Sequence, residues 1–492
     1  MELPLRLAGA LWGHLVGDAL GVPYEFRPPG EIGPVVFGAR GTHGQPPGTW
    51  SDDGALTLAL LDSLLSAGFD PADQGRRFLA WREQGAYTPD GDGVFDIGGT
   101  TAAALRRIRD GVPAETAGPA GEHDNGNGSL MRVLPLALVG HTLPDAALAE
   151  QAHRASAVSH GHPLAQVACA WYVLTARELL LADGTGIERA EAPERARAAL
   201  HALYDPSPAH AEHARALARL EAYGQRSGSG FVADAWWSAW DAFAGADSYP
   251  ATLERAIRHG HDTDTTAAIA GGLAGAWYGL DGIPPDWLAR MRGHAIVAPL
   301  LDRLLETAGW RTSSVHPLYL DWLDVAAIPE GAGWTGRLGM TILPGRKGAG
   351  EAFDYWRDLE ADAGQLAALG VTRFLLLVED HELRESRVPD LVAVLDAHGI
   401  AVLRHPVRDL DVPADPAAYR ATLARVTGWL REGRTVGVAC RGGLGRTGTA
   451  VACLALDAGL PAEEAIALVR RCRRGAIERP GQEAFVRAWG TR

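Results

Sequence analysis

Lysine is almost missing from this chain of 492 residues, because only one of its 46 basic side chains, Lys347, is a lysine. No run of more than a few basic residues occurs anywhere, and the formal net charge is −14. A nucleic-acid-binding surface needs clustered positive charge. The composition therefore argues against nucleic acid as a partner.

Long apolar stretches are missing as well. No uninterrupted run is long enough to span a bilayer, so we expect no membrane partner. The first residues lack the basic segment that opens a signal peptide, and His14 and Asp18 interrupt their apolar run. The four cysteines show neither metal-binding nor disulfide spacing, and they are Cys169, Cys440, Cys453 and Cys472. These absences favour a reducing cytoplasm.

The chain is long enough for two or three domains, and its two halves differ in pattern. Up to about residue 300, apolar residues recur with helical spacing, at 53–67, 99–110, 144–156, 162–182, 189–223, 231–243 and 263–280. No β-branched run there suggests a sheet. The first half is therefore predicted to be an all-α bundle with its functional groups in loops.

From about residue 335, short β-like runs alternate with helical stretches. The predicted strands are 338–343, 372–378, 401–405 and 435–439, and the predicted helices are 356–369, 386–398, 415–432 and 447–457. Such alternation predicts an α/β domain with a central, mostly parallel sheet. The predicted organisation is multidomain: an all-α domain at 1–300, a packed linker at 301–335 and an α/β domain at 336–492.

Two short acidic clusters, Ser51-Asp52-Asp53 and Asp262-Thr263-Asp264-Thr265, lie far apart in the all-α half. Both mix carboxylates with hydroxyls, the hard oxygen donors that Mg²⁺, Mn²⁺ or Ca²⁺ prefer. Each is followed at once by an apolar helical run, where uncompensated carboxylates are costly. Either cluster alone reads more simply as a helix N-cap. The occurrence of two such clusters favours a shared metal site.

Other loops of this half place polar residues beside glycine. Asp18 and Glu25 lie at the end of the first helix, and Asp96 lies in F-D-I-G-G-T-T. The turn H-D-N-G-N-G-S-L-M-R contains Asn127, and S-H-G-H-P contains His160. Each alone also has a structural interpretation, as an N-cap or an Asn-Gly turn.

Taken in this order, the motifs over about residues 5–295 resemble the ADP-ribosylglycohydrolase family. The resemblance implies an all-α fold, two Mg²⁺ or Mn²⁺ ions and cleavage of ADP-ribose from an acceptor. The implied metal ligands are Ser51, Asp52, Asp53, Asp262, Asp264 and Thr265. Glu25 would be a general base or gate, and the implied substrate-binding residues are Asp96, Asn127, Gly128, Ser129 and His160. The family usually has Thr where Ser51 stands and Gly where His261 stands.

The other half has the sequence C-R-G-G-L-G-R-T-G after a predicted strand. Cys440 and Arg446 bracket five residues that would cradle a phosphate with backbone N–H groups: Arg441, Gly442, Gly443, Leu444 and Gly445. These donors also favour the thiolate form of Cys440, the nucleophile. Arg446 could grip two phosphate oxygens.

This loop resembles that of the dual-specificity-type cysteine phosphatases. Over about 335–489 the chain resembles, in particular, the kinase-associated phosphatase (cyclin-dependent kinase inhibitor 3) family, because it also contains the segments L-P-G-R-K, V-E-D-H-E-L, H-P-V-R-D-L-D-V-P and R-G-A-I-E-R-P-G-Q. The resemblance makes Asp409 the general acid, with Asp411 as a rival. Thr447 would assist breakdown of the phosphocysteine, and Gln482 would position water. Ala439 stands where the family has His, which predicts reduced activity.

The sequence therefore predicts a bifunctional hydrolase, acting on an ADP-ribosylated protein or small molecule and on a phosphorylated protein or small molecule. The phosphatase half needs no cofactor. The acceptor of the ADP-ribose remains open. The alternative is an active ADP-ribosylglycohydrolase whose second half only senses phosphate or binds protein.

Overall fold

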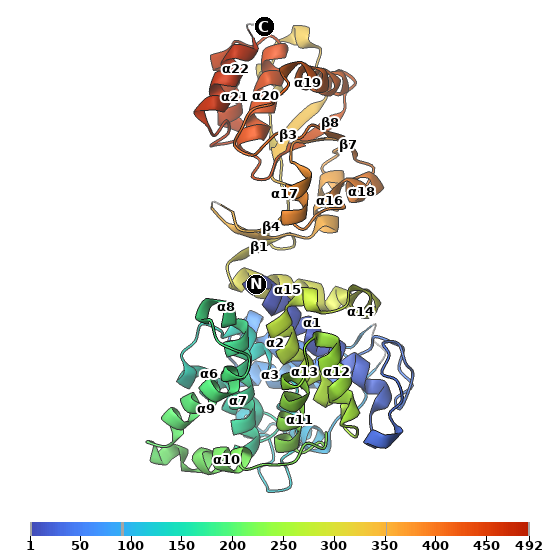
Figure 1. Cartoon of the computed structure of the whole chain (residues 1–492), viewed down its shortest axis with the longest axis vertical. Helices are drawn as coiled ribbons and strands as arrows, with labels where there is room; N and C mark the ends of the chain where they lie inside the picture. Colours follow the sequence, from blue (N-terminus) through green and yellow to red (C-terminus); the bar gives the residue numbers. More distant parts are fainter. Residues whose placement is uncertain (1, 90–92, 351, 491–492) are drawn as a thin grey trace. The chain divides into compact units, whose positions relative to one another are not determined.

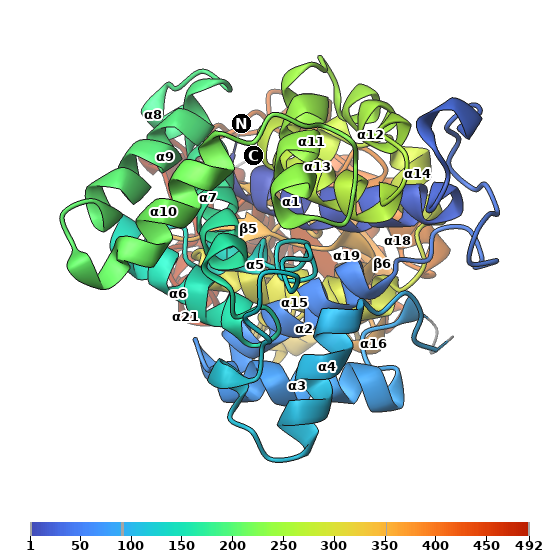
Figure 2. The same cartoon turned by 90° about the horizontal axis from the view of Figure 1, so that it is seen from below.

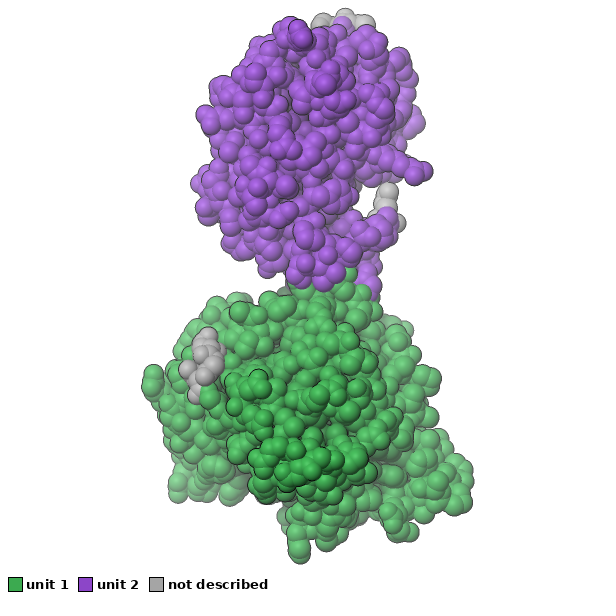
Figure 3. All heavy atoms as spheres, turned by 180° about the vertical axis from the view of Figure 1, so that it is seen from behind, with its two compact units in different colours: residues 1–308 green, residues 309–492 purple. Residues whose placement is uncertain are grey.

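The chain forms two compact units, residues 1–308 and 309–492 (Figure 3). This computed structural model describes residues 2–89, 93–350 and 352–490. None of the helices within those ranges is both long and apolar enough to cross a lipid bilayer. The residues expected to form a linker, 301–335, are divided between the units.

The first unit is built from helices, which confirms the predicted all-α class (Figures 1 and 2). Its helices are α1 (Leu3–Gly21), η1 (Val22–Tyr24), η2 (Pro29–Glu31), α2 (Asp52–Ala67), α3 (Pro71–Gln84), α4 (Gly99–Arg109), η4 (Ala114–Thr116), α5 (Pro135–Val139), α6 (Asp145–Ala157), α7 (Pro163–Leu180), α8 (Ala182–Thr185), α9 (Glu191–Tyr204), η5 (Pro208–His210), α10 (Ala211–Glu221), α11 (Val232–Ala244), α12 (Tyr249–Arg258), α13 (Thr263–Tyr278), η6 (Leu280–Gly282), α14 (Pro285–Arg290) and α15 (His294–Thr307).

The centre of this unit is the packing of α1 against α13 (Figure 1). Glycine recurs at every fourth residue of α1, so one face of that helix has no side chain. A Cβ atom at Gly17 would lie 2.2 Å from the carbonyl oxygen of Ala267, and one at Gly13 would lie 2.5 Å from that of Gly271. This close approach brings the end of α1, with Asp18, against the start of α13, with Asp264.

The second unit is an α/β domain with the predicted, mostly parallel sheet. The strand order is β2-β3-β8-β6-β7, with β2 antiparallel to β3 and all other pairs parallel. These strands are β2 (Asp321–Trp322), β3 (Arg337–Thr341), β6 (Arg373–Leu376), β7 (Ala401–Arg404) and β8 (Thr435–Ala439). A separate sheet has the order β1-β5-β4, from β1 (Trp310–Thr312), β5 (Asp354–Trp356) and β4 (Lys347–Gly348).

Helices flank the larger sheet, and its core consists of buried apolar residues such as Leu338, Phe374 and Val438. The helices of this unit are η7 (Val325–Ala327), η8 (Glu330–Ala332), α16 (Leu359–Ala368), α17 (Asp380–Glu385), α18 (Leu391–Ala397), α19 (Pro416–Arg431), α20 (Gly445–Asp457), α21 (Ala462–Cys472) and α22 (Pro480–Trp489). The central strand β8 ends directly at the Cys440 loop.

Three expectations differ from the observed elements. The predicted helix 189–223 is broken into α9 and α10, because Pro206 and Pro208 cannot continue a helix. The predicted helix 386–398 is likewise interrupted before α18, where Arg387 has a left-handed φ of 59° and Pro389 follows. The expected linker contains the end of α15 and the strands β1 and β2.

Candidate active sites

The two acidic clusters meet at the N-terminal ends of α2 and α13. The hydroxyl of Thr265 donates to the carboxylate of Asp53, with Oγ1 lying 3.2 and 3.1 Å from its two oxygens. The residues are 212 positions apart in the chain. The structure therefore joins both clusters in one buried site, as the metal hypothesis requires.

The N-cap interpretation holds for only one cluster. Ser51 caps α2, because its Oγ accepts a hydrogen bond from the backbone N–H of Asp53 at 3.2 Å. Asp262 precedes α13 but makes no side-chain cap. Instead, its Oδ2 accepts a hydrogen bond from Nδ2 of Asn127 at 2.7 Å. The second cluster thus has carboxylates that helix capping does not explain.

Asp18 holds the first cluster in place from the end of α1. Its carboxylate accepts hydrogen bonds from the backbone N–H groups of Ser51, at 2.9 and 3.0 Å, and of Gly54, at 2.8 Å. Complete burial raises the pKa of Asp18 to about 7 despite these bonds. The sequence placed Asp18 at the end of the first helix but did not include it among the predicted ligands.

The donor set fits a divalent cation. Oxygen atoms of Asp18, Asp53 and Asp264 lie within 4.8 Å of one another, and so do those of Glu25, Asp262 and Asp264. Oδ2 of Asp264 is fully buried and has no hydrogen-bond partner within the part of the chain that the structure describes. Burial and neighbouring carboxylates raise the pKa values of the acidic ligands, which are Asp52, Asp53, Asp262 and Asp264. A cation would neutralise this crowding of negative charge.

Glu25, His43 and Asp96 form a second group beside the acidic cluster. The Nε2 atom of His43 contacts Oε2 of Glu25 and lies 3.8 Å from Oδ1 of Asp96. Burial, followed by the charges of Asp96 and Asp262, raises the pKa of Glu25 to about 10. His43 was not predicted from the sequence, although T-H-G, only eight residues before Ser51, was an available signal.

The glycine-rich turn expected to bind substrate lies against the same site. Asn127 reaches Asp262, as described, and its backbone N–H donates to Gly230 at 3.0 Å. His160 packs under the turn, since a Cβ on Gly128 would lie 3.0 Å from its Cε1 atom. Burial, followed by the charge of Arg132, lowers the pKa of His160 to about 3, so the ring is neutral.

Ser129 is placed deeper than a residue that lines an open cleft. It is 1% exposed, and its hydroxyl accepts hydrogen bonds from Ser156 at 2.9 Å and from Cys169 at 3.4 Å. Asp96, in contrast, is partly exposed at the head of α4. The structure therefore assigns Ser129 a contact with the protein interior and leaves Asp96 open to a ligand.

His261, the unusual residue before the second cluster, has a left-handed backbone with φ of 58°. Glycine adopts this conformation most readily. The backbone of His261 pairs with the segment after Glu25, donating to Arg27 at 2.7 Å and accepting from Phe26 at 2.6 Å. Its imidazole is exposed. The left-handed backbone conformation at this position thus allows the pairing with Phe26 and Arg27. Among the described residues, the structure shows no contact of the His261 ring with the predicted acidic ligands.

In the second unit, the Cys440 loop joins β8 to α20 in the predicted way. Cys440 is 3% exposed, and the backbone N–H of Gly443 donates to its sulfur at 3.2 Å. Gly443 has φ of 70°, and a Cβ there would lie 2.2 Å from the carbonyl oxygen of Thr341. The loop is therefore closed tightly around the sulfur atom.

Arg446 is held by two carboxylates and a carbonyl. Glu382 accepts two hydrogen bonds from its guanidinium, both at 2.7 Å, and the carbonyl of Val407 accepts a third at 2.8 Å. Asp409, the predicted general acid, accepts from Nη2 at 2.7 Å. The segment V-E-D-H-E-L, which contains Glu382, supported the phosphatase resemblance, but no role was predicted for this glutamate.

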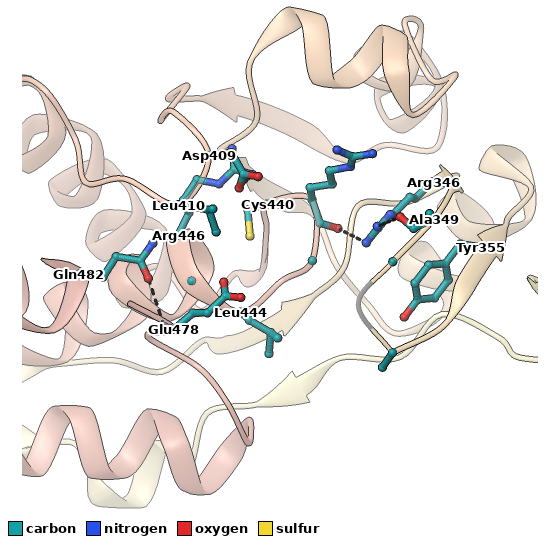
Figure 4. A pocket seen from close by; sticks show the side chains of 15 residues that line it. Arg346, Ala349, Tyr355, Asp409, Leu410, Cys440, Leu444, Arg446, Glu478 and Gln482 are labelled. Atoms are coloured by element: carbon teal, nitrogen blue, oxygen red, sulfur yellow. Dashed lines mark hydrogen bonds and ion pairs between the residues drawn. The ribbon is translucent and has the colours of Figure 1, made fainter. Parts of the chain in front are cut away.

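A cavity of about 410 Å³ opens in front of Cys440 (Figure 4). Asp409 and Gln482 line it together with the loop, whereas Asp411 is exposed and hydrogen-bonds to the backbone of Val412. Gln482 also links two loops, because its Nε2 donates to the carbonyl of Asp411 at 3.3 Å. These positions favour Asp409 over Asp411 as the acid.

Two further positions of this site are buried. The hydroxyl of Thr447 has no hydrogen-bond partner among the described residues. Ala439 lies on β8 between β3 and β6, paired with Thr341 and Leu376, and is 0% exposed. A methyl group thus fills the place of the imidazole that the resemblance leads one to expect.

Comparisons with known proteins agree with both halves. Residues 2–313 match the ADP-ribosylglycohydrolase family, and residues 312–466 match the cyclin-dependent kinase inhibitor 3 family. The ADP-ribosyl-[dinitrogen reductase] glycohydrolase of Rhodospirillum rubrum is 32% identical over 317 residues, covering 62% of this chain and 97% of the relative. The cyclin-dependent kinase inhibitor 3 of Homo sapiens is 30% identical over 165 residues, covering 33% of this chain and 74% of the relative.

Among solved structures, an ADP-ribosylglycohydrolase-related protein complex is similar, with a TM-score of 0.51 and 32% identity. The match covers 62% of this chain and 99% of that structure. Enzymes of the first family are hydrolases, and the second is a phosphatase family. The chain therefore belongs to the ADP-ribosylglycohydrolase family and carries, C-terminal to that domain, a domain of the cyclin-dependent kinase inhibitor 3 phosphatase family.

Proposed function

We propose that the chain is a bifunctional hydrolase that removes ADP-ribose from an acceptor at a two-metal site and hydrolyses phosphomonoesters at Cys440. The observation that carries the first activity is the buried, unpartnered Oδ2 of Asp264 among the carboxylates of Asp18 and Asp53. Two Mg²⁺ or Mn²⁺ ions would be held by Ser51, Asp52, Asp53, Asp262, Asp264 and Thr265. When bound, they supply positive charge and a water of lowered pKa.

The side chains around this site would accept the proton from water and orient the substrate. Glu25 and His43 are in contact, and Asp96 lies near them, so a proton taken from an attacking water has an acceptor beside the ligands. Asn127 and the backbone of Gly128 orient the substrate, while the neutral ring of His160 supports their turn from below. The substrates would be ADP-ribosylated proteins or small molecules.

Removal of the metal tests the first activity. ADP-ribose release from a panel of acceptors (ADP-ribosylated arginine, ADP-ribosylated serine and O-acetyl-ADP-ribose) should stop in EDTA and return with Mg²⁺ or Mn²⁺. Metal analysis of the purified protein should give about two ions per chain. Release that continues at full rate in EDTA contradicts the two-metal proposal.

The geometry of the Cys440 loop supports the second proposed activity. The sulfur of Cys440 attacks phosphorus, the ester P–O bond breaks, and Asp409 gives its proton to the leaving oxygen. Water then attacks phosphorus and the S–P bond breaks, which releases inorganic phosphate and the thiolate. The unpartnered hydroxyl of Thr447 is available to donate to the sulfur as it leaves, and Gln482 lies where it could position that water.

A phosphate gripped by Arg446 would compete with Asp409 for the same Nη2 atom, so substrate binding frees the acid. The test is turnover of p-nitrophenyl phosphate that vanadate blocks and that Cys440→Ser abolishes. Because Ala439 replaces an imidazole, we expect a slow rate. Binding of phosphate without turnover would instead support the non-catalytic, phosphate-sensing alternative.

A further inference from the structure

The cavity in front of Cys440 is lined by three arginines whose charges are balanced to different degrees. Arg446 pairs with Glu382 and Asp409, as described. Nη1 of Arg441 lies 3.7 Å from a carboxylate oxygen of Glu385. For Arg346, no carboxylate lies within 4.0 Å among the residues that the structure describes. Among the residues that the structure describes, Arg346 is therefore the arginine of this cavity without a carboxylate partner.

Arg346 is buried and fixed beside the catalytic loop, immediately before β4. It is 6% exposed, and its Nη1 atom donates to the backbone carbonyl of Arg441 at 3.4 Å. Nη2 donates to the carbonyl of Ala349, and the guanidinium carbon lies 4.9 Å from the centre of the Tyr355 ring. Its Nε atom is buried, and none of the described residues offers it a hydrogen-bond partner.

This arrangement costs free energy in the unliganded protein. Neutral carbonyls and one aromatic ring replace only part of the hydration that a guanidinium loses on burial. Burial, followed by the nearby charge of Arg441, lowers the pKa of Arg346 from its ordinary value. An anion bound at Arg346 would offset this cost.

We propose that Arg346 forms a second anion subsite beside the Cys440 loop, so that the phosphatase half prefers phosphomonoesters carrying a second phosphate close to the one removed. This inference rests on the proposed phosphomonoester hydrolysis and names its substrate class. Arg346 hydrogen-bonds to the residue next to the nucleophile, so both phosphates would bind in one cavity.

The charges around Cys440 give the substrate a direction. Figure 4 shows Arg346 and Tyr355 on one side of Cys440, with Glu478 and Gln482 on the other. Arg346 attracts a second anion to its own side of the cavity. The cavity of about 410 Å³ is within the usual range for a small-molecule site. A small bisphosphate or two neighbouring phosphates on a peptide would supply the same chemistry.

The test compares two esters that differ by one phosphate, phenyl phosphate and 1,3-phenylene bisphosphate, with the full chain. We expect kcat/KM for the bisphosphate to exceed that for phenyl phosphate by about tenfold or more. Arg346→Gln should reduce this ratio to about 1 to 2, while Arg346→Lys should keep a ratio of several-fold because it retains the charge. Arg471→Gln, which removes an exposed arginine of α21, is the matched control and should leave the ratio unchanged.

The affinities of the two esters for the inactive variant Cys440→Ser test the subsite without turnover. They therefore distinguish a failure of the subsite proposal from a failure of the proposed phosphatase activity. If neither ester is turned over, phosphatase activity is refuted, and tighter binding of the bisphosphate that Arg346→Gln abolishes still supports the subsite. A ratio near 1 in the unaltered chain, or one that Arg346→Gln leaves intact, overturns it. Thermal unfolding checks that each variant is folded. If Arg346→Gln does not fold, the comparison is made with Arg346→Lys instead.

Two further pairs of substrates show whether the second phosphate belongs to a small molecule or to a protein. One compares adenosine 3′,5′-bisphosphate with adenosine 5′-monophosphate, and the other compares a doubly with a singly phosphorylated peptide. The pair whose ratio depends on Arg346 identifies the substrate as a small molecule or a protein. Absence of any such dependence in both pairs counts against the subsite.

Discussion

Asp264 has a buried carboxylate oxygen, Oδ2, for which the described residues offer no hydrogen-bond partner. Its Oδ1 accepts from the backbone N–H of Thr265 at 2.9 Å, and the residue is 0% exposed. In Asp264→Asn, the amide can donate to a neighbouring carboxylate. We expect the metal-free variant to be more stable than the unaltered protein by about 1 to 3 kcal/mol, the usual cost of an unsatisfied buried polar group.

The same variant should lose the response to metal. A ligand at 100 times its Kd stabilises a protein by about 2.7 kcal/mol, so Mg²⁺ or Mn²⁺ should raise the Tm of unit 1 clearly. Asp264→Asn should abolish most of this rise and nearly all ADP-ribose release. Asp110→Asn, at an exposed position after α4, is the control. An equal metal-induced shift in Asp264→Asn would show that the ion binds elsewhere.

Glu382 is the corresponding residue of the phosphatase site, because it positions Arg446. Burial alone raises the pKa of Glu382, but the hydrogen bonds from Arg446, a hydrogen bond from the backbone N–H of Glu379 and the charge of Arg446 together hold the pKa below its usual value of 4.5. The stabilisation is therefore present above the pKa of the unfolded chain and is lost as pH falls through the folded-state pKa. Glu382→Gln should cost about 3 kcal/mol at pH 7.

The pH profile distinguishes this electrostatic contribution from simple packing. The difference in free energy of unfolding between Glu382→Gln and the unaltered chain should shrink as pH falls below about 4.5, where the carboxylate is protonated. Denaturant unfolding at several pH values measures it. A difference that is constant from pH 7 to pH 3 would mean that the ion pair contributes nothing. Turnover of p-nitrophenyl phosphate should also fall, since Arg446 loses its bidentate partner.

Sequence motifs predicted the ligands and the loop but not the residues that support them. Asp53, Asp264, Cys440 and Arg446 lie in compact patterns whose chemistry can be read from neighbouring letters. Glu382, by contrast, reaches Arg446 across 64 positions of sequence, and a single glutamate in a helix has no distinctive pattern. Such contacts depend on the fold, which is why His43 was missed as well.

At the scale of elements, the contact of α1 with α13 aligns the residues of the proposed metal site. Gly17, next to Asp18, faces the backbone of Ala267, which lies about one turn after Asp264. Gly17→Ala should therefore force the helices apart, with a cost of about 1 to 3 kcal/mol in unfolding free energy. Because the two ligand-bearing ends move with their helices, we also expect weaker metal binding and slower ADP-ribose release.

Gly184→Ala is the matched control for this prediction. Gly184 lies in the short helix α8, and nothing lies within 4 Å of the place that an added methyl group would occupy, so the substitution should be neutral or slightly stabilising. Thermal unfolding and a metal titration measure both variants. If Gly17→Ala is as stable and binds metal as tightly as Gly184→Ala, the close packing does not align the site.

The regular elements follow from apolar spacing, and their interruptions follow from local chemistry. The strands β3, β6, β7 and β8 were predicted within a few residues, because apolar runs mark a buried parallel sheet. The strands β1, β2, β4 and β5 have only two or three residues each, too few for any periodic signal. Their pairing is determined by contacts within the folded unit.

At the scale of the whole molecule, each unit holds a candidate site and a core of its own. Residues Asp18 to Thr265 supply the acidic site, and residues Arg346 to Gln482 supply the cavity around Cys440. The function predicted from sequence therefore divides where the chain divides. The observed units end at residue 308 and begin at residue 309, whereas the sequence patterns predicted these limits at 300 and 336.

Fragments of the chain cut at the observed limits and at the predicted limits would contain different residues. Their stabilities therefore test which limits are correct. A fragment 1–300 would lack the second half of α15, where Leu304 and Leu305 are buried and Arg303 donates to Asp62 at 2.8 Å. A fragment 336–492 would lack Asp321, which pairs with Arg473 beside the Cys440 loop.

We therefore expect 1–308 and 309–492 to fold and to keep their separate activities at near full rate. The shorter fragments should unfold at least about 5 °C lower, because each loses buried apolar side chains worth several kcal/mol, Leu304 and Leu305 from the first and Leu318 and Leu320 from the second. Thermal unfolding and the two activity assays on all four fragments measure this, and equal Tm values for the long and short forms would show that 301–335 is only a linker.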